Sequence, residues 1–313
     1  MPSVQPPGKI LVTGVNGFLG AHIARDLLER GFSVIGTVRS PVKGDEISKY
    51  FRQYGERFGY IVAQDISQPE AFDEILSTGK FDGVAHTAAP YSPTVERVVF
   101  MSSVSAASQL NPSIMIREAD WNEEILEIVE EKGNAASDLE LYMRSKVLSE
   151  RAAWKFVEDN GKSINVDLVA VLPAGVLGTP INENTPLDQL GATSYLFGGL
   201  GTTRSESQLA ETRISFVHVK DVAALCSECF MQPRATGHRV FAATAEPNDA
   251  LNEEPAFTGV PKGKPGVGKR PDDESSGYDM SFAKSLLGRK VIGANDMIRE
   301  AARYYQKQAG GFL

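Results

Sequence analysis

Short apolar runs alternate with amphipathic stretches along the chain as far as residue 178. The runs are typical of strands buried on both faces of a parallel sheet, and they cover residues 9–14, 33–39, 60–67, 82–89, 97–106 and 165–178. The stretches between or after them carry apolar residues at helical spacing over residues 18–31, 45–55, 70–76 and 137–161. This alternation predicts an α/β fold with a Rossmann-type doubly wound parallel sheet.

A smaller mixed α/β lobe is expected to complete the fold. The pattern becomes mixed and glycine-rich from about Pro173, and residues 246–280 are rich in Pro, Gly and charge, as a surface excursion is. Between them, RISFVHVKDVAALCSECF predicts a strand followed by a helix. We therefore assign residues 1–172 with 213–245 to a dinucleotide-binding domain, and residues 173–212 with 246–313 to a substrate lobe.

The connection between the fourth and fifth predicted strands is short. About eight residues, PYSPTVER, separate DGVAHTAA from RVVFMSS, whereas a crossover between adjacent parallel strands usually needs a dozen residues or more and contains a helix. Eight extended residues reach ~26 Å, which is enough to return along the sheet but not to form a covering helix as well. The crossover helix between these strands is therefore predicted to be missing.

Composition and charge narrow the class of protein. Of the 313 residues, 42% are hydrophobic and 23% charged, as in ordinary globular proteins. The net charge of -8 disfavours nucleic acid and anionic membranes as partners. The N-terminus has no apolar signal region, and no apolar stretch approaches the ~20 residues of a membrane span. We expect a cytoplasmic protein without nucleic-acid or membrane partners.

The two cysteines, Cys226 and Cys229, stand in a C-x-x-C spacing within an apolar run. A redox pair or half of a zinc site is conceivable, but a zinc site needs two more ligands and the sequence has no second Cys/His cluster. We interpret them as core residues of a helix and expect no metal.

A glycine-rich turn, Thr13 to Gly20, lies between the first predicted strand and helix. Glycines allow a tight turn and a close approach of a pyrophosphate, which then lies at the helix N-terminus. Within a βαβ unit this motif favours dinucleotide binding over a purely structural turn. The predicted contacts in the turn are Gly14, Asn16, Gly17, Phe18, Leu19 and Gly20.

The ends of the second and third strands indicate the cofactor. Strand two ends at Arg39, with Lys43 just beyond and no acid before Asp45. An arginine here accommodates a 2′-phosphate, whereas an acid would bind the ribose of NAD. NADPH is therefore favoured, the alternative being a solvated surface arginine. Asp65, at the end of strand three, is either an adenine contact or a plain loop aspartate.

Tyr142 and Lys146 are four residues apart on a predicted helix and so share one face. A free phenol has a pKa near 10, and a neighbouring ammonium lowers such a pKa by favouring the phenolate. The spacing suits general acid/base chemistry, although it also occurs by chance on many helices. Ser102 and Ser103, at the end of strand five, could polarise a substrate carbonyl.

In order along the chain, TGVNGFLG, VRS, QDIS, HTAAP, VVFMSS, YMRSK and FVHVKDVA closely resemble the motifs of extended short-chain dehydrogenases/reductases. More narrowly, the chain resembles the dihydroflavonol-reductase-like carbonyl and methylglyoxal reductases. The resemblance covers nearly the whole sequence. One departure is that such relatives carry a full helix between HTAAP and VVFMSS.

The resemblance implies roles for individual residues. Ser103 corresponds to the catalytic serine, Tyr142 to the acid and Lys146 to the residue that tunes it. Gly14, Gly17 and Gly20 would hold the pyrophosphate and Arg39 the 2′-phosphate. The remaining cofactor contacts would come from Asp65, Ile66, Thr87, Ala88, Ala89, Pro173, Gly175 and Val176.

The implied function is NADPH-dependent reduction of a small aldehyde or ketone by hydride transfer, with Tyr142 as the acid. Two alternatives stay open. One is a nucleotide-sugar epimerase or dehydratase, and the other is a non-catalytic NADP-binding protein that has lost turnover with the missing helix. We expect a small-molecule carbonyl substrate and a monomer or homodimer.

Overall fold

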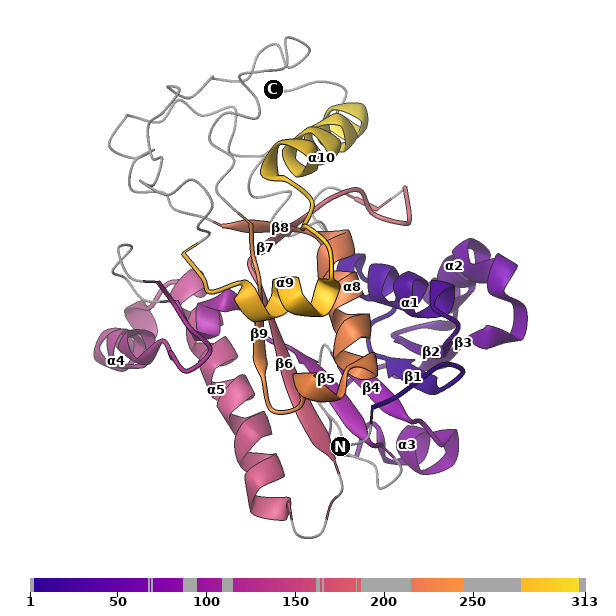
Figure 1. The fold of residues 1–313 in the computed structure, drawn as a ribbon, viewed down its shortest axis with the longest axis horizontal. Coiled ribbons are helices and arrows are strands. Elements are labelled where there is room, and N and C mark those ends of the chain that lie inside the picture. Colours follow the sequence, from indigo (N-terminus) through magenta and orange to yellow (C-terminus); the bar gives the residue numbers. More distant parts are fainter. Residues whose placement is uncertain are drawn as a thin grey trace.

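A seven-stranded parallel sheet forms the centre of the computed structural model, which describes residues 3–66, 68, 70–86, 95–108, 115–161, 164, 166–183, 185–186, 215–244 and 277–309. Each pair of neighbouring strands runs parallel (Figure 1). The predicted α/β class and doubly wound sheet are confirmed. In spatial order the strands are β3 (Phe58–Val62), β2 (Ser33–Val38), β1 (Lys9–Val12), β4 (Gly83–His86), β5 (Arg97–Met101), β6 (Asp167–Pro173) and β9 (Arg239–Ala242).

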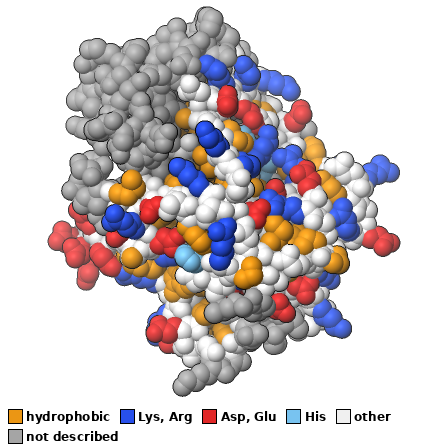
Figure 2. Space-filling view, in the orientation of Figure 1, with side chains coloured by type: hydrophobic (Ala, Val, Ile, Leu, Met, Phe, Trp, Pro, Cys, Tyr) orange, Lys and Arg blue, Asp and Glu red, His pale blue; other side chains and the backbone are white. Residues whose placement is uncertain are grey.

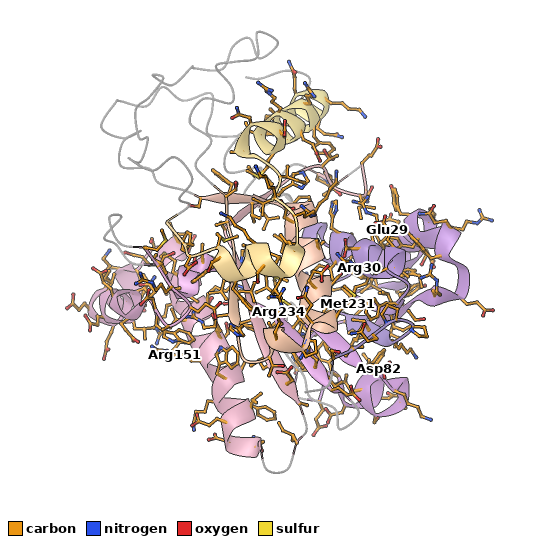
Figure 3. The ribbon with its side chains drawn as sticks, in the orientation of Figure 1. Glu29, Arg30, Asp82, Arg151, Met231 and Arg234 are labelled. Carbon is orange, nitrogen blue, oxygen red and sulfur yellow. The ribbon has the colours of Figure 1, made fainter. Side chains whose placement is uncertain are left out.

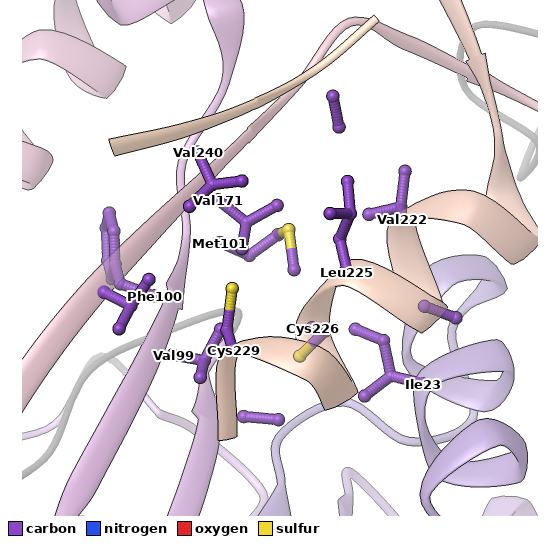
Figure 4. Close-up of a cluster of buried hydrophobic side chains, with 14 of the residues drawn as sticks. Ile23, Val99, Phe100, Met101, Val171, Val222, Leu225, Cys226, Cys229 and Val240 are labelled. Atoms are coloured by element: carbon purple, nitrogen blue, oxygen red, sulfur yellow. The ribbon is translucent and has the colours of Figure 1, made fainter. Parts of the chain in front are cut away.

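Helices cover both faces of this sheet because its strands alternate their side chains between two sides. On β5, Val99 and Met101 point towards α8 (Figure 4), whereas Ser102, the next residue, hydrogen-bonds to Glu150 of α5. One face packs against α1 (Phe18–Glu29), α2 (Pro41–Phe51) and α8 (Val219–Met231). The other packs against α3 (Asp73–Gly79) and α5 (Asp138–Asn160).

Helix α8 is largely buried. Cys226 and Cys229 are fully buried free thiols among the apolar side chains between α8, α1 and the sheet (Figure 4), which confirms their interpretation as core residues. Burial raises the pKa of Cys229 to about 12. At the rim of this contact, Arg30 at the end of α1, labelled in Figure 3, pairs with Glu228 of α8 at 2.6 Å.

The stretch 165–178, predicted as one strand, forms two. At Ala174 the chain leaves the main sheet, since its N–H donates to the Ala242 carbonyl while that of Gly175 donates to Ser215. β7 (Gly175–Leu177) then pairs with β8 (Phe216–His218) in a separate two-stranded sheet. The apolar pattern continues through both strands and does not mark this change of partner.

Further elements complete the described part of the chain. Helix α10 (Ala294–Ala309) packs against β7 and β8, whereas α9 (Ser281–Leu287) packs against α8 and β9. Helix α4 (Glu123–Lys132) packs against α5. Short 3₁₀ helices are η1 (Arg52–Arg57), η2 (Val104–Ala106), η3 (Gly133–Ala135) and η5 (Pro233–Ala235). The division into two domains stays a prediction, and the predicted excursion lies outside the described residues except for residues 277–280.

The predicted absence of a crossover helix falls on residues 87–94, which lie outside the described part of the chain, so it stays a prediction. The flanking strands pair directly, with Gly83 of β4 opposite Arg97 of β5.

Helix α5 exposes Leu141, Leu148 and Phe156 by 42–45%. The longest helix therefore carries solvent-exposed apolar side chains.

The surface in Figure 2 mixes both signs of charge. Acidic side chains gather over α4 at the left edge, whereas basic and acidic side chains are interspersed over the rest of this face. None of the described helices is long and apolar enough to cross a membrane.

Candidate active site

The glycine turn between β1 and α1 has a conformation that only glycine satisfies at two positions. Gly14 has a φ of 63°, in the left-handed region, and its N–H donates to Thr37 Oγ1 at 3.1 Å. A Cβ on Gly20 would lie 2.4 Å from the Gly14 carbonyl oxygen. The helix therefore begins directly against the turn, as a pyrophosphate cradle requires.

Two helix N-termini at this edge of the sheet are open to anions. Helix α1 begins after Gly17 with no side-chain cap and no acid in its first turn, so its first N–H groups and its dipole favour a phosphate. Helix α2 begins after Ser40, also without a side-chain cap or an acid. Arg39 and Lys43 flank this second N-terminus and are exposed. Within the described residues neither makes a side-chain hydrogen bond or ion pair. The turn and these cations fit a dinucleotide that carries an additional phosphate.

The other predicted cofactor contacts are less closely defined. Asn16, Phe18 and Leu19 are half-buried around the turn, and Asp65 and Ile66 are exposed beyond β3. The Asp65 carboxylate accepts a hydrogen bond from Gln68 at 2.8 Å. Pro173 ends β6, and Gly175 and Val176 lie in β7. Thr87, Ala88 and Ala89 lie outside the described residues. These contacts stay predictions.

Helix α5 brings Tyr142 and Lys146 together, as the sequence predicts. The helix begins with a capping box formed by Ser137 and Glu140. Lys146 Nζ lies 5.7 Å from the centroid of the Tyr142 ring. Burial lowers the pKa of Lys146, and the negative charge of Glu150 opposes this effect. The ammonium group is thus close to the phenol in a partly desolvated setting, where charges interact more strongly than in water.

The two serines after β5 point to different neighbours. Ser103 is 7% exposed and begins η2, where its Oγ accepts a hydrogen bond from the Ser105 N–H at 3.2 Å. Helix η2, which follows Ser103, packs against α5. Ser102 instead donates to the buried Glu150 carboxylate at 2.6 Å. Because the Ser102 hydroxyl is engaged by Glu150, Ser103 is favoured as the serine available to a substrate.

His86, at the end of β4, lies against the residue that begins the glycine turn. Its ring is 1% exposed, and its Nδ1 lies 3.4 Å from Thr13 Oγ1. Burial and then the charge of Lys146 hold the pKa of His86 well below its ordinary value, which favours the neutral imidazole. Its Nε2 is buried and has no hydrogen-bond partner among the described residues, so it is a polar atom that a bound molecule could satisfy. The signal that sequence reasoning missed is a histidine in an otherwise apolar strand.

Known proteins resemble this chain in sequence and in fold. Residues 10–96 match the model of the NAD dependent epimerase/dehydratase family. Ketoreductase adrE of Penicillium roqueforti is 34% identical over 275 residues, which cover 77% of this chain and 78% of that protein. This chain belongs to the epimerase/dehydratase family, the extended short-chain dehydrogenases/reductases.

Other members of the family match over almost their whole length. NADPH-dependent methylglyoxal reductase GRE2 of Saccharomyces cerevisiae is 28% identical over 344 residues, covering 96% of this chain and 99% of that protein. The crystal structure of yeast methylglyoxal/isovaleraldehyde reductase Gre2 complexed with NADPH has a TM-score of 0.81 and 26% identity, over 96% and 99% of the two chains. An alignment of 344 residues exceeds the 313 of this chain, so that relative carries segments without a counterpart here.

Proposed function

We propose that this protein is an NADPH-dependent oxidoreductase that reduces a small aldehyde or ketone to an alcohol. The observation that carries the proposal is the Tyr142–Lys146 pair on α5, in the same fold as an uncapped glycine turn that suits a pyrophosphate. The relatives named as NADPH-dependent methylglyoxal reductase and ketoreductase support the same assignment.

Gly14, Gly17 and Gly20 would hold the pyrophosphate of the cofactor, and Arg39 with Lys43 its 2′-phosphate. The cofactor, when bound, supplies the hydride. The remaining contacts proposed from the sequence are Asn16, Phe18, Leu19, Asp65, Ile66, Thr87, Ala88, Ala89, Pro173, Gly175 and Val176.

Three side chains would act on the substrate carbonyl. Ser103 Oγ donates a hydrogen bond to the carbonyl oxygen and orients it, and the Tyr142 hydroxyl gives that oxygen a proton as the alcohol forms. The Lys146 ammonium stabilises the phenolate that remains, because opposite charges attract strongly in a partly buried site. The same three residues would also support the reverse reaction. The ratio of reduced to oxidised cofactor would set the direction.

A thermal-shift comparison tests the cofactor assignment. We expect NADPH to raise the melting temperature more than NADH does at equal concentration, because only NADPH offers a 2′-phosphate to Arg39. Arg39→Ala should remove most of this difference. Lys49→Ala, which deletes another exposed cation of α2, is the matched control and should retain it. Equal shifts by the two cofactors in the wild-type protein contradict the assignment.

A panel of aldehydes and ketones tests the reaction. NADPH oxidation that depends on the added carbonyl, and that is lost in Tyr142→Phe, is the expected result. Tightly bound NAD in the purified protein would instead favour an epimerase or dehydratase.

A non-catalytic NADP-binding protein is the second candidate. The observation that favours it is the 46% exposure of Tyr142 on the helix that also exposes Leu148 and Phe156, since a catalytic acid normally works in a water-excluding pocket. Stabilisation by NADPH without turnover of any carbonyl in the panel supports this candidate. The cytoplasmic location and the monomeric or homodimeric state stay predictions.

A further inference from the structure

Glu150 is a fully buried carboxylate that lies one helical turn beyond Lys146 on α5. Its two oxygens accept hydrogen bonds from Ser102 Oγ at 2.6 Å, from Trp154 Nε1 at 3.2 Å, and from Arg239 Nε and Nη2 at 2.6 and 3.3 Å. One side chain thus joins the end of β5, helix α5 and strand β9.

The partner of this carboxylate is itself firmly held. Arg239 also donates to the carbonyl oxygens of Glu118 and Asp120, and its guanidinium carbon lies 3.8 Å from the centroid of the Trp121 ring. A buried ion pair is expensive to desolvate, and apolar residues of similar size often stabilise a fold as well or better. Packing alone therefore gives no reason for a charged pair behind the catalytic helix.

Lys146 provides that reason. It is a second cation near the same carboxylate, and Glu150 is the group whose charge raises the pKa of Lys146 against the effect of burial. Among the described residues, Tyr142 on its own helix and His86 on β4 also interact with Lys146. An imidazole is neutral or positively charged, so His86 cannot supply the negative charge.

The Glu150 carboxylate also affects the strand end, because it holds the Ser102 hydroxyl. Because consecutive residues of an extended chain point in opposite directions, fixing the Ser102 hydroxyl on Glu150 also fixes the orientation of the next residue, Ser103. Ser102, the first residue after β5, thereby anchors the serine that would meet the substrate.

We propose that Glu150 is a positioning residue of the reductase site, which orients Ser103 through Ser102 and holds a negative charge one helical turn from Lys146. This inference rests on the proposed function for its role in turnover, but the effect on Lys146 is a property of the cofactor-free protein.

The test measures the acylation rate of individual lysines in the cofactor-free protein at pH 8, by peptide mass spectrometry. Only the neutral amine reacts. In Glu150→Gln, which keeps an acceptor oxygen but removes the charge, the rate at Lys146 should rise about tenfold, since a nearby opposite charge typically shifts a pKa by one unit or more. Lys155, an exposed lysine of the same helix paired with Asp159, is the internal control and should keep its rate.

Two further variants separate charge from structure. Glu150→Asp restores the carboxylate and should return the Lys146 rate most of the way to the wild-type value. Glu158→Gln removes an exposed carboxylate of the same helix and should leave the Lys146 rate and the turnover number unchanged. A rate in Glu150→Asp as high as in Glu150→Gln overturns the assignment.

If Glu150→Gln does not fold, the double variant Glu150→Gln/Arg239→Met removes both buried charges and serves in its place. A folded variant in which Lys146 reacts at the wild-type rate overturns the proposal. A raised Lys146 rate in a chain whose wild type reduces no carbonyl supports the electrostatic role of Glu150 and refutes the proposed function alone. With an active wild type, the turnover number of Glu150→Gln should fall about tenfold at neutral pH.

Discussion

His22 makes the stability of this protein depend on pH in a way that a single substitution can isolate. The side chain is 2% exposed on α1, where its Nε2 lies 3.0 Å from the Thr179 carbonyl oxygen and its Nδ1 lies 3.0 Å from Arg25 Nη2. The neutral ring satisfies both contacts, because Nε2–H donates to the carbonyl and Nδ1 accepts from the guanidinium. A proton on Nδ1 would remove the second hydrogen bond and place two cations together.

The pKa of His22 is accordingly lowered from 6.5 to about 3, first by burial and then by the charge of Arg25, with smaller contributions from His218 and Lys220. Between these two values the unfolded chain carries a proton on His22 and the folded chain does not. Protonation therefore favours unfolding. The stabilisation is fully present above pH 6.5 and is lost as the pH falls towards 3.

Proton binding by His22 in the folded and in the unfolded chain together lowers the free energy of unfolding by about 2 kcal/mol between pH 7.5 and pH 5. The assay is urea unfolding at both pH values for the wild type and for His22→Gln. The glutamine amide can donate to the Thr179 carbonyl and accept from Arg25, but it does not titrate. We expect the wild type to lose about 2 kcal/mol more than the variant between the two pH values.

All other titrating groups are common to the two proteins, so their contributions cancel in the comparison. Equal losses in the wild type and in His22→Gln would refute the argument that burial and Arg25 keep this histidine neutral. A variant much less stable at pH 7.5, but with a smaller loss on acidification, would leave the titration argument standing.

Three further outcomes are expected. Arg97→Met, at the amino-terminal end of β5, should destabilise the fold by about 3–5 kcal/mol in urea unfolding, because it leaves a buried carboxylate and several carbonyl groups unpaired; an effect below about 1 kcal/mol contradicts this. Gly20→Ala should weaken NADPH binding in a fluorescence titration more than Gly17→Ala, since the added Cβ would meet backbone at 2.4 Å rather than 3.2 Å. Cys226 and Cys229 should resist a water-soluble thiol reagent until the protein is unfolded, and rapid labelling of the native protein would show that α8 is not packed as described.

The glycine turn and the catalytic helix were predictable because their chemistry is local. The spacing of Tyr142 and Lys146 places them on one helix face whatever surrounds the helix, and the turn before Gly20 lies within one βαβ unit. Glu150 was equally open to prediction, since it stands four residues after Lys146 on the same face. Sequence reasoning overlooked it because a glutamate on a helix is usually a solvated residue.

The sequence by itself determined the fold class, since alternating apolar strands and amphipathic helices admit few arrangements other than a doubly wound parallel sheet. It also determined which side chains carry the candidate chemistry. The tertiary structure decided how these residues are supported. His86 meets Thr13 only because β4 lies beside β1, and Glu150 meets Arg239 only because β9 lies beside β6. Contacts of this kind join residues far apart in the chain, and neither periodicity nor spacing encodes them.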